Sequence, residues 1–108
     1  LRKFVMMYKW DVLDALSLIE KEKISIFHGV PTMTWEIMQS EKFKSTDLSS
    51  LRGVNSGGAA RPPEHLKMML EKFPPKAIPG LGYGLTETNA IGAIISGKFY
   101  EAKPHSTG

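Results

Sequence analysis

The sequence has no cysteine among its 108 residues. A disulfide framework, a thiolate nucleophile and a cysteine-held zinc site are therefore excluded, and this composition suits a reducing compartment. We expect a cytoplasmic protein on that ground. The sequence also has no apolar run that approaches the length of a membrane span, so no transmembrane segment is predicted.

Blocks of like charge are missing as well. The 14 basic and 11 acidic residues are spread evenly and leave a net charge of +3. Nucleic-acid-binding proteins usually carry a basic patch interleaved with aromatic residues, so we do not expect a nucleic-acid partner. Hydrophobic residues make up 42% and charged residues 23%, which are values typical of a globular domain and argue against disorder.

The sequence does contain a compact run of residue types that suit a ligand. The run reads Gly82-Tyr83-Gly84-Leu85-Thr86-Glu87-Thr88. Because glycine lets the backbone approach a ligand and tolerates positive φ, we expect a loop in which Gly82 and Gly84 press the ring of Tyr83 against a flat group. Thr86 offers a hydroxyl to a phosphate, and Glu87 offers a hard oxygen to a cation such as Mg²⁺. The run therefore predicts a nucleotide site, and a tight turn with a surface glutamate is the alternative.

Apolar runs and helical periodicities alternate along the chain. We expect strands at 2–8, 24–30, 51–55, 76–81 and 90–95, and helices at 12–23, 31–39 and 62–73. The strand at 24–30 is rich in β-branched residues, which is typical of burial on both faces. Trp35, Met33 and Met38 are expected in the core, with a wall of a substrate pocket as the alternative. The tail from 96 to 108 shows no periodicity. This alternation predicts an α/β fold: a parallel sheet of βαβ units with helices on both faces, in three layers.

Small residues follow two of the predicted strands. Ser56, Gly57, Gly58 and Ala59 follow one of them, and the run 80–84 follows another. Because ligands of parallel sheets bind beyond the carboxyl ends of the strands, we expect both segments to meet at one crevice. A helix cap and turn is the alternative for 56–60, and both roles can hold together. His28, near a strand end, is either structural or part of a substrate pocket, and neither His65 nor His105 has partners at metal spacing.

Three segments together resemble the adenylate-forming superfamily, which includes acyl-CoA synthetases, beetle luciferases and the adenylation domains of peptide synthetases. They are Val30-Pro31-Thr32-Met33, Ser56-Gly57-Gly58-Ala59 and the run 82–88. Leu85 is similar to the acyl-CoA synthetase and luciferase branch, since peptide-synthetase domains usually carry proline there. Two further segments resemble bacterial fatty-acid-CoA ligases, Asn89-Ala90-Ile91-Gly92 and Ser106-Thr107-Gly108.

The resemblance implies a role for each matching position. The backbone of 57–59, next to Ser56, would lie along the adenine of ATP or AMP, and the ring of Tyr83, between its two glycines, would stack on it. Thr86 would contact the α-phosphate, and Glu87 would bind the Mg²⁺ that bridges the phosphates. The implied reaction joins a fatty acid to AMP with release of pyrophosphate, and then forms a thioester with coenzyme A.

The resemblance also implies missing parts. Relatives carry a phosphate loop upstream, and a ribose-binding aspartate, a hinge and a catalytic lysine downstream, and none of these occurs in residues 1–108. We therefore expect a single α/β fragment of the N-terminal domain of such an enzyme, inactive by itself. The alternative is a non-catalytic nucleotide-binding or oligomerisation module, and a homo-oligomer is compatible with both interpretations.

Overall fold

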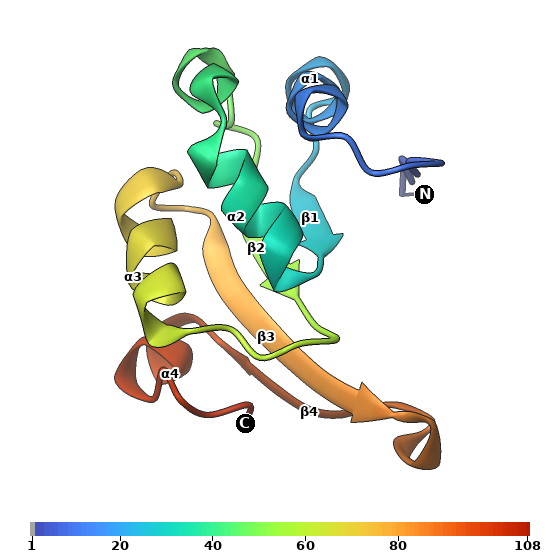
Figure 1. Ribbon diagram of the computed structural model, residues 1–108, viewed down its shortest axis with the longest axis vertical. Coiled ribbons are helices and arrows are strands. Elements are labelled where there is room, and N and C mark those ends of the chain that lie inside the picture. Colours follow the sequence, from blue (N-terminus) through green and yellow to red (C-terminus); the bar gives the residue numbers. More distant parts are fainter. Residues whose placement is uncertain (1) are drawn as a thin grey trace.

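The structure, a computed structural model, describes residues 2–108 and confirms the α/β fold class. Its elements are α1 (Val12–Glu22), β1 (Ile26–Gly29), α2 (Pro31–Gln39), the 3₁₀ helix η1 (Glu41–Ser45), β2 (Gly53–Ser56), α3 (Pro63–Lys72), β3 (Ile78–Leu85), the 3₁₀ helix η2 (Thr86–Thr88), β4 (Ala90–Ser96) and α4 (Gly97–Ala102) (Figure 1). No helix in the described range is long and apolar enough to cross a bilayer.

The four strands form one sheet in the order β1-β2-β3-β4. The first three are parallel, and their register sets Ile26, Gly53 and Ile78 side by side. β4 returns antiparallel to β3, with Leu81 opposite Ile95. Figure 1 shows this long hairpin extending well beyond the two shorter strands. The predicted parallel sheet is therefore present and carries one antiparallel strand at its edge.

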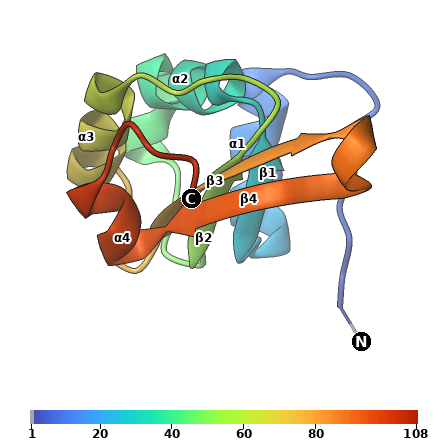
Figure 2. The same cartoon turned by 90° about the horizontal axis from the view of Figure 1, so that it is seen from below.

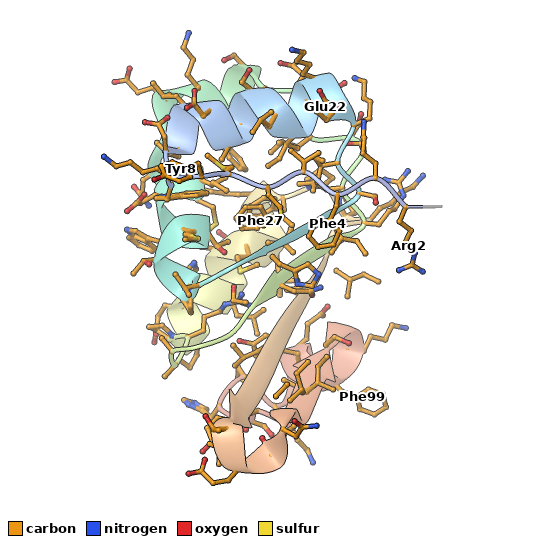
Figure 3. All side chains as sticks on the ribbon, turned by 90° about the vertical axis from the view of Figure 1, so that its right-hand side faces the viewer. Arg2, Phe4, Tyr8, Glu22, Phe27 and Phe99 are labelled. Carbon is orange, nitrogen blue, oxygen red and sulfur yellow. The ribbon has the colours of Figure 1, made fainter. Side chains whose placement is uncertain are left out.

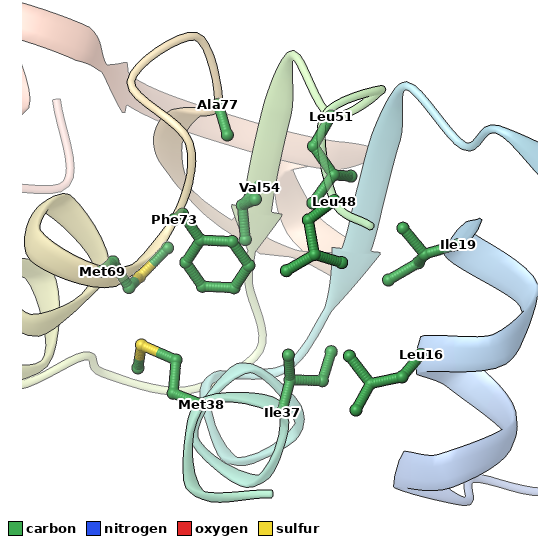
Figure 4. Packing of buried hydrophobic residues seen from close by; sticks show 10 residues of the cluster. All are labelled: Leu16, Ile19, Ile37, Met38, Leu48, Leu51, Val54, Met69, Phe73 and Ala77. Carbon is green, nitrogen blue, oxygen red and sulfur yellow. The ribbon is translucent and has the colours of Figure 1, made fainter. Parts of the chain in front are cut away.

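One face of the sheet holds the core. Val54 of β2 is fully buried and belongs to a cluster that also takes side chains from α1, α2 and α3. Figure 4 shows ten residues of this cluster: Leu16, Ile19, Ile37, Met38, Leu48, Leu51, Val54, Met69, Phe73 and Ala77. A second cluster joins Leu66, Leu81, Ile95 and Tyr100, and so brings α4 to the same face. Figure 2 shows α2 and α3 together on one side of the β3–β4 hairpin.

The opposite face of the sheet is open in the described residues. Ile26, Ile78 and Ile94 lie on it and are 47%, 51% and 66% exposed. The expectation that the strand at 24–30 is buried on both faces is therefore wrong for β1, because its outward side chains have no helix against them. Residues 2–108 supply two of the three expected layers: the sheet and the helices on one face.

Three local predictions also fail. Residues 2–8 form no strand; Phe4 and Tyr8 are 86% and 107% exposed, and Figure 3 shows the segment passing across α1 and β1. An apolar run becomes a strand only where another strand accepts its backbone hydrogen bonds, and this segment pairs with none. Trp35 is 43% exposed, whereas Met38 is buried as predicted. The tail, expected to be irregular, forms α4 because Tyr100 is fully buried there.

Candidate functional site

A hollow of about 740 Å³ lies at the carboxyl ends of β1 and β2 and along the β3–β4 hairpin. This is the edge at which parallel sheets bind ligands. Its lining comprises His28, Gly29, Asn55, Ser56, Gly57, Gly58, Gly80, Leu81, Gly82, Tyr83, Gly84, Leu85, Thr86, Asn89, Ala90, Ile91 and Ile94. The two small-residue segments expected to meet at one crevice therefore both border this hollow.

The segment 57–60, which we call the glycine loop, connects β2 to the approach of α3. Its first residue packs against the other wall of the hollow, since a Cβ on Gly57 would stand only 3.1 Å from the carbonyl oxygen of Gly82. The backbone N–H of Gly57 donates to the carbonyl oxygen of Gly29 at 3.2 Å. Gly58 has φ +83°, a left-handed conformation that favours glycine. Bare backbone therefore forms this wall, because a side chain would be crowded by Gly82 at position 57 and strained by the backbone conformation at position 58.

The run 82–88 is not the loop that the sequence suggested. It continues β3 as far as Leu85 and then forms the single turn η2. Neither Gly82 nor Gly84 has a positive φ; the left-handed residues here are Asn89 at 54° and Ala90 at 106°. The tolerance of glycine for positive φ is therefore not used at either position, and close approach of the paired strand explains Gly84. A side chain there would overlap the carbonyl oxygen of Ala90 on the paired strand.

The side chains that can contact a ligand lie at the exposed end of the hairpin. The ring of Tyr83 is 51% exposed and Thr86 lines the hollow. The hydroxyl of Thr88 holds η2 in place. It accepts a hydrogen bond from the N–H of Leu85 at 3.0 Å and donates one to the carbonyl oxygen of Leu85 at 2.9 Å. No role was predicted for Thr88, although a threonine at a turn commonly makes such bonds. The turn thus presents Thr86 and Glu87 from a fixed backbone.

Seven of the nine predicted site residues line the hollow, and two do not. Those that do are Ser56, Gly57, Gly58, Gly82, Tyr83, Gly84 and Thr86. Ala59 is exposed beside it in the glycine loop, and Glu87 is exposed on η2.

In residues 2–108 no three histidine, aspartate or glutamate side chains form a metal-binding group. Magnesium usually takes one or two carboxylates and completes its shell with phosphate oxygens and water, so the single carboxylate of Glu87 suits that ion.

Two polar side chains form the floor of the hollow: His28, for which a substrate pocket was one of two predicted roles, and Asn55, for which no role was predicted. His28 and Asn55 are register partners on β1 and β2, and both line the hollow on the open face of the sheet. The amide of Asn55 lies across Gly80, where a Cβ would come within 3.3 Å of the amide carbon and overlap its oxygen. A polar residue inside an otherwise apolar strand is the sequence signal that indicates this position.

Comparison with known proteins places this geometry among enzymes. The sequence matches the family model described as AMP-binding enzyme over residues 2–108. 4-Coumarate–CoA ligase 1 from Glycine max is 37% identical over 87 residues, which make up 81% of this chain and 29% of that ligase.

Two solved structures resemble the fold over almost the whole chain. The N-terminal domain of FACL13 from Mycobacterium tuberculosis aligns with a TM-score of 0.83 and 27% identity over 94% of this chain and 25% of that one. O-succinylbenzoate coenzyme A synthetase (MenE) from Bacillus subtilis, in complex with ATP and magnesium ion, aligns with a TM-score of 0.77 and 25% identity over 93% of this chain and 20% of that one. The matched region spans less than a third of each relative.

Proposed function

Because this chain belongs to the AMP-binding enzyme family, we propose that it is one α/β part of the N-terminal domain of an ATP-dependent acyl-CoA synthetase. In this proposal the hollow receives the adenylate end of ATP. The single observation that supports the site most strongly is the meeting of the glycine loop with Gly82 and Tyr83 at one hollow.

Each wall of the hollow suits a different part of the nucleotide. Gly57 and Gly58 present bare backbone, against which a flat base can lie, and the half-exposed ring of Tyr83 offers a stacking surface. The hydroxyl of Thr86, one turn further on, suits a phosphate oxygen. We propose that adenine lies at the glycine loop and Tyr83, and that the α-phosphate lies at Thr86.

Catalysis of adenylate formation then depends on positioning and charge. The carboxylate of the acid attacks the α-phosphorus, the bond to the pyrophosphate group breaks, and acyl-adenylate forms. Magnesium, when bound, neutralises charge on the phosphates. We propose that Glu87 holds that ion and that Thr86 donates to the α-phosphate as charge develops. The thiol of coenzyme A then attacks the acyl carbonyl, which releases AMP.

The floor of the hollow is left for the acid. His28, Asn55 and Gly80 border it, with Ile91 and Ile94 at 67% and 66% exposure nearby. We propose a fatty acid as the substrate, because the exposed isoleucines suit a hydrocarbon chain. An aromatic hydroxy acid is the second candidate, supported by the polar pair on the floor and by the Glycine max ligase, whose name contains 4-coumarate.

The chain alone provides part of such a site, and we propose that it is inactive without the rest of the enzyme. A non-catalytic nucleotide-binding or oligomerisation module is the second proposal, because Ile26 and Ile78 leave an apolar sheet face open. Sedimentation of the 108-residue chain distinguishes an assembling module from a monomeric part.

Acid-dependent exchange of labelled pyrophosphate into ATP tests the proposed activity in the full-length protein. Octanoate, hexadecanoate and 4-coumarate are compared, each followed by a thioester assay with coenzyme A. Exchange that requires one of these acids, with thioester formed only when coenzyme A is added, is the expected result. Absence of exchange with every acid, from a folded protein supplied with ATP and magnesium, would contradict the proposal.

A further inference from the structure

A buried arginine stands at the end of the glycine loop. Arg61 is only 5% exposed, although it lies between an exposed loop and the first turn of α3. No role was predicted for Arg61 from the sequence. It does not line the hollow, so it cannot touch a ligand bound there.

The guanidinium of Arg61 joins three parts of the fold. Its Nη2 donates to the hydroxyl oxygen of Ser56 at the end of β2. The same hydroxyl lies 3.4 Å from the hydroxyl of Thr34, which is fully buried in α2. On its other side, the guanidinium carbon lies 5.7 Å from the ring centroid of Tyr100 in α4, within the range of a cation–π interaction.

These contacts come at a considerable desolvation cost. Burial lowers the pKa of Arg61, and its interactions with Tyr100 raise it only in part. Among the described residues no carboxylate forms a salt bridge with Arg61, and its Nε and Nη1 have no hydrogen-bond partner. An apolar side chain could pack on Tyr100 without that cost. Packing alone therefore does not explain an arginine at this position.

The contact with Ser56 closes the glycine loop into a ring. Ser56 precedes the loop and Arg61 follows it, so one side-chain bond fixes the distance between its two ends. Within the ring, Gly58 adopts a left-handed conformation, and because glycine has no side chain, its backbone is otherwise free to move. We propose that Arg61 is a positioning residue that holds the glycine loop in its nucleotide-binding conformation. This inference rests on the proposed function, since it assumes that the loop contacts adenine.

The expected result is a selective loss of ATP affinity. In the full-length enzyme, Arg61→Met frees the end of the loop, so the KM for ATP should rise about tenfold, equivalent to about 1.4 kcal/mol. The kcat should stay within about twofold and the KM for the acid should not change, because Arg61 does not line the hollow. Ser56→Ala removes the acceptor and should raise the same KM, which also provides the test if Arg61→Met does not fold. Arg61→Lys should recover part of the affinity.

Two further measurements separate positioning from general damage. Adenosine should inhibit Arg61→Met less well than wild type, whereas inorganic tripolyphosphate should inhibit both equally, because the loop faces the base. The KM for ATP of the double variant of Ser56 and Arg61 should be no higher than that of the poorer single variant, since both substitutions remove the same contact. Arg52→Met is the matched control: Arg52 is exposed before β2, and its guanidinium donates to the carbonyl oxygens of Ser49 and Leu51 in the adjoining turn.

If the wild type is active and the KM for ATP is unchanged in Arg61→Met and Ser56→Ala, the role of Arg61 is overturned and the proposed function is not. Equal loss of adenosine and tripolyphosphate inhibition would do the same, since it indicates general damage. A wild-type enzyme that shows no acid-dependent use of ATP would overturn the proposed function, and this inference with it.

Discussion

The two glycines beside Tyr83 should have separable effects, one on stability and one on binding. A methyl group on Gly84 would overlap the carbonyl oxygen of Ala90 and stand 2.8 Å from that residue's carbonyl carbon and 3.2 Å from the Cα of Ile91. All three atoms are backbone of the paired strand, so β4 must shift and its pairing with β3 must weaken. We expect Gly84→Ala to lower the free energy of unfolding by about 2 kcal/mol.

Gly82→Ala is the matched comparison. The nearest atom to a methyl group there is the carbonyl oxygen of Ser56 at 4.0 Å, which is ordinary contact, so stability should change by less than about 0.5 kcal/mol. The methyl group would nevertheless stand in the wall of the hollow, and the KM for ATP should rise about tenfold. Urea unfolding and steady-state kinetics of both variants in the full-length protein measure the two effects. Equal unfolding free energies, or a wild-type KM in Gly82→Ala, would refute the reasoning.

Three further predictions concern charge, pH and completeness. Glu87→Gln in the full-length protein should lower pyrophosphate exchange roughly 100-fold, whereas Glu101→Gln on α4 should not; exchange at the wild-type rate would exclude the metal role. Burial, together with the charge of Arg61, lowers the pKa of His65, so the folded protein binds this proton less readily than the unfolded chain does. Stability is then lost as pH falls below about 6.5, and the Tm should fall more steeply between about pH 7 and 5.5 in wild type than in His65→Gln; parallel curves would contradict this. The isolated 108-residue chain should bind ATP no more tightly than about millimolar in calorimetry, and micromolar affinity would show that residues 1–108 suffice for ATP binding.

Local sequence signals predicted the helices and strands that are specified by residues close to them in the sequence. Asp11 caps α1 by accepting from the N–H of Asp14, and prolines open α2 and α3, as their positions indicate. The strands β1 to β3 follow from apolar runs between these helices, and the topology of parallel strands brought Ser56 and Gly82 to one edge of the sheet. The fold class and the meeting of these two segments at one edge of the sheet were therefore predictable.

Long-range contacts decided what the sequence could not predict. Residues 2–8 are as apolar as a strand, but no other strand pairs with them. α4 forms because Leu66 and Ile95, far apart in the sequence, enclose Tyr100. Gly84 is required by a strand that returns opposite it, and Arg61 contacts both Ser56 of β2 and Tyr100 of α4, so neither role is visible from neighbouring residues.

Photolabelling with 8-azido-ATP tests most directly whether the glycine loop and Tyr83 form the adenine site. After labelling of the full-length protein and digestion with trypsin, the label should lie on the peptides 53–67 and 77–98, which contain the glycine loop and Tyr83. Excess ATP should abolish this labelling, and Tyr83→Ala should weaken it. ATP-protected label on other peptides, with none on these two, would contradict the account.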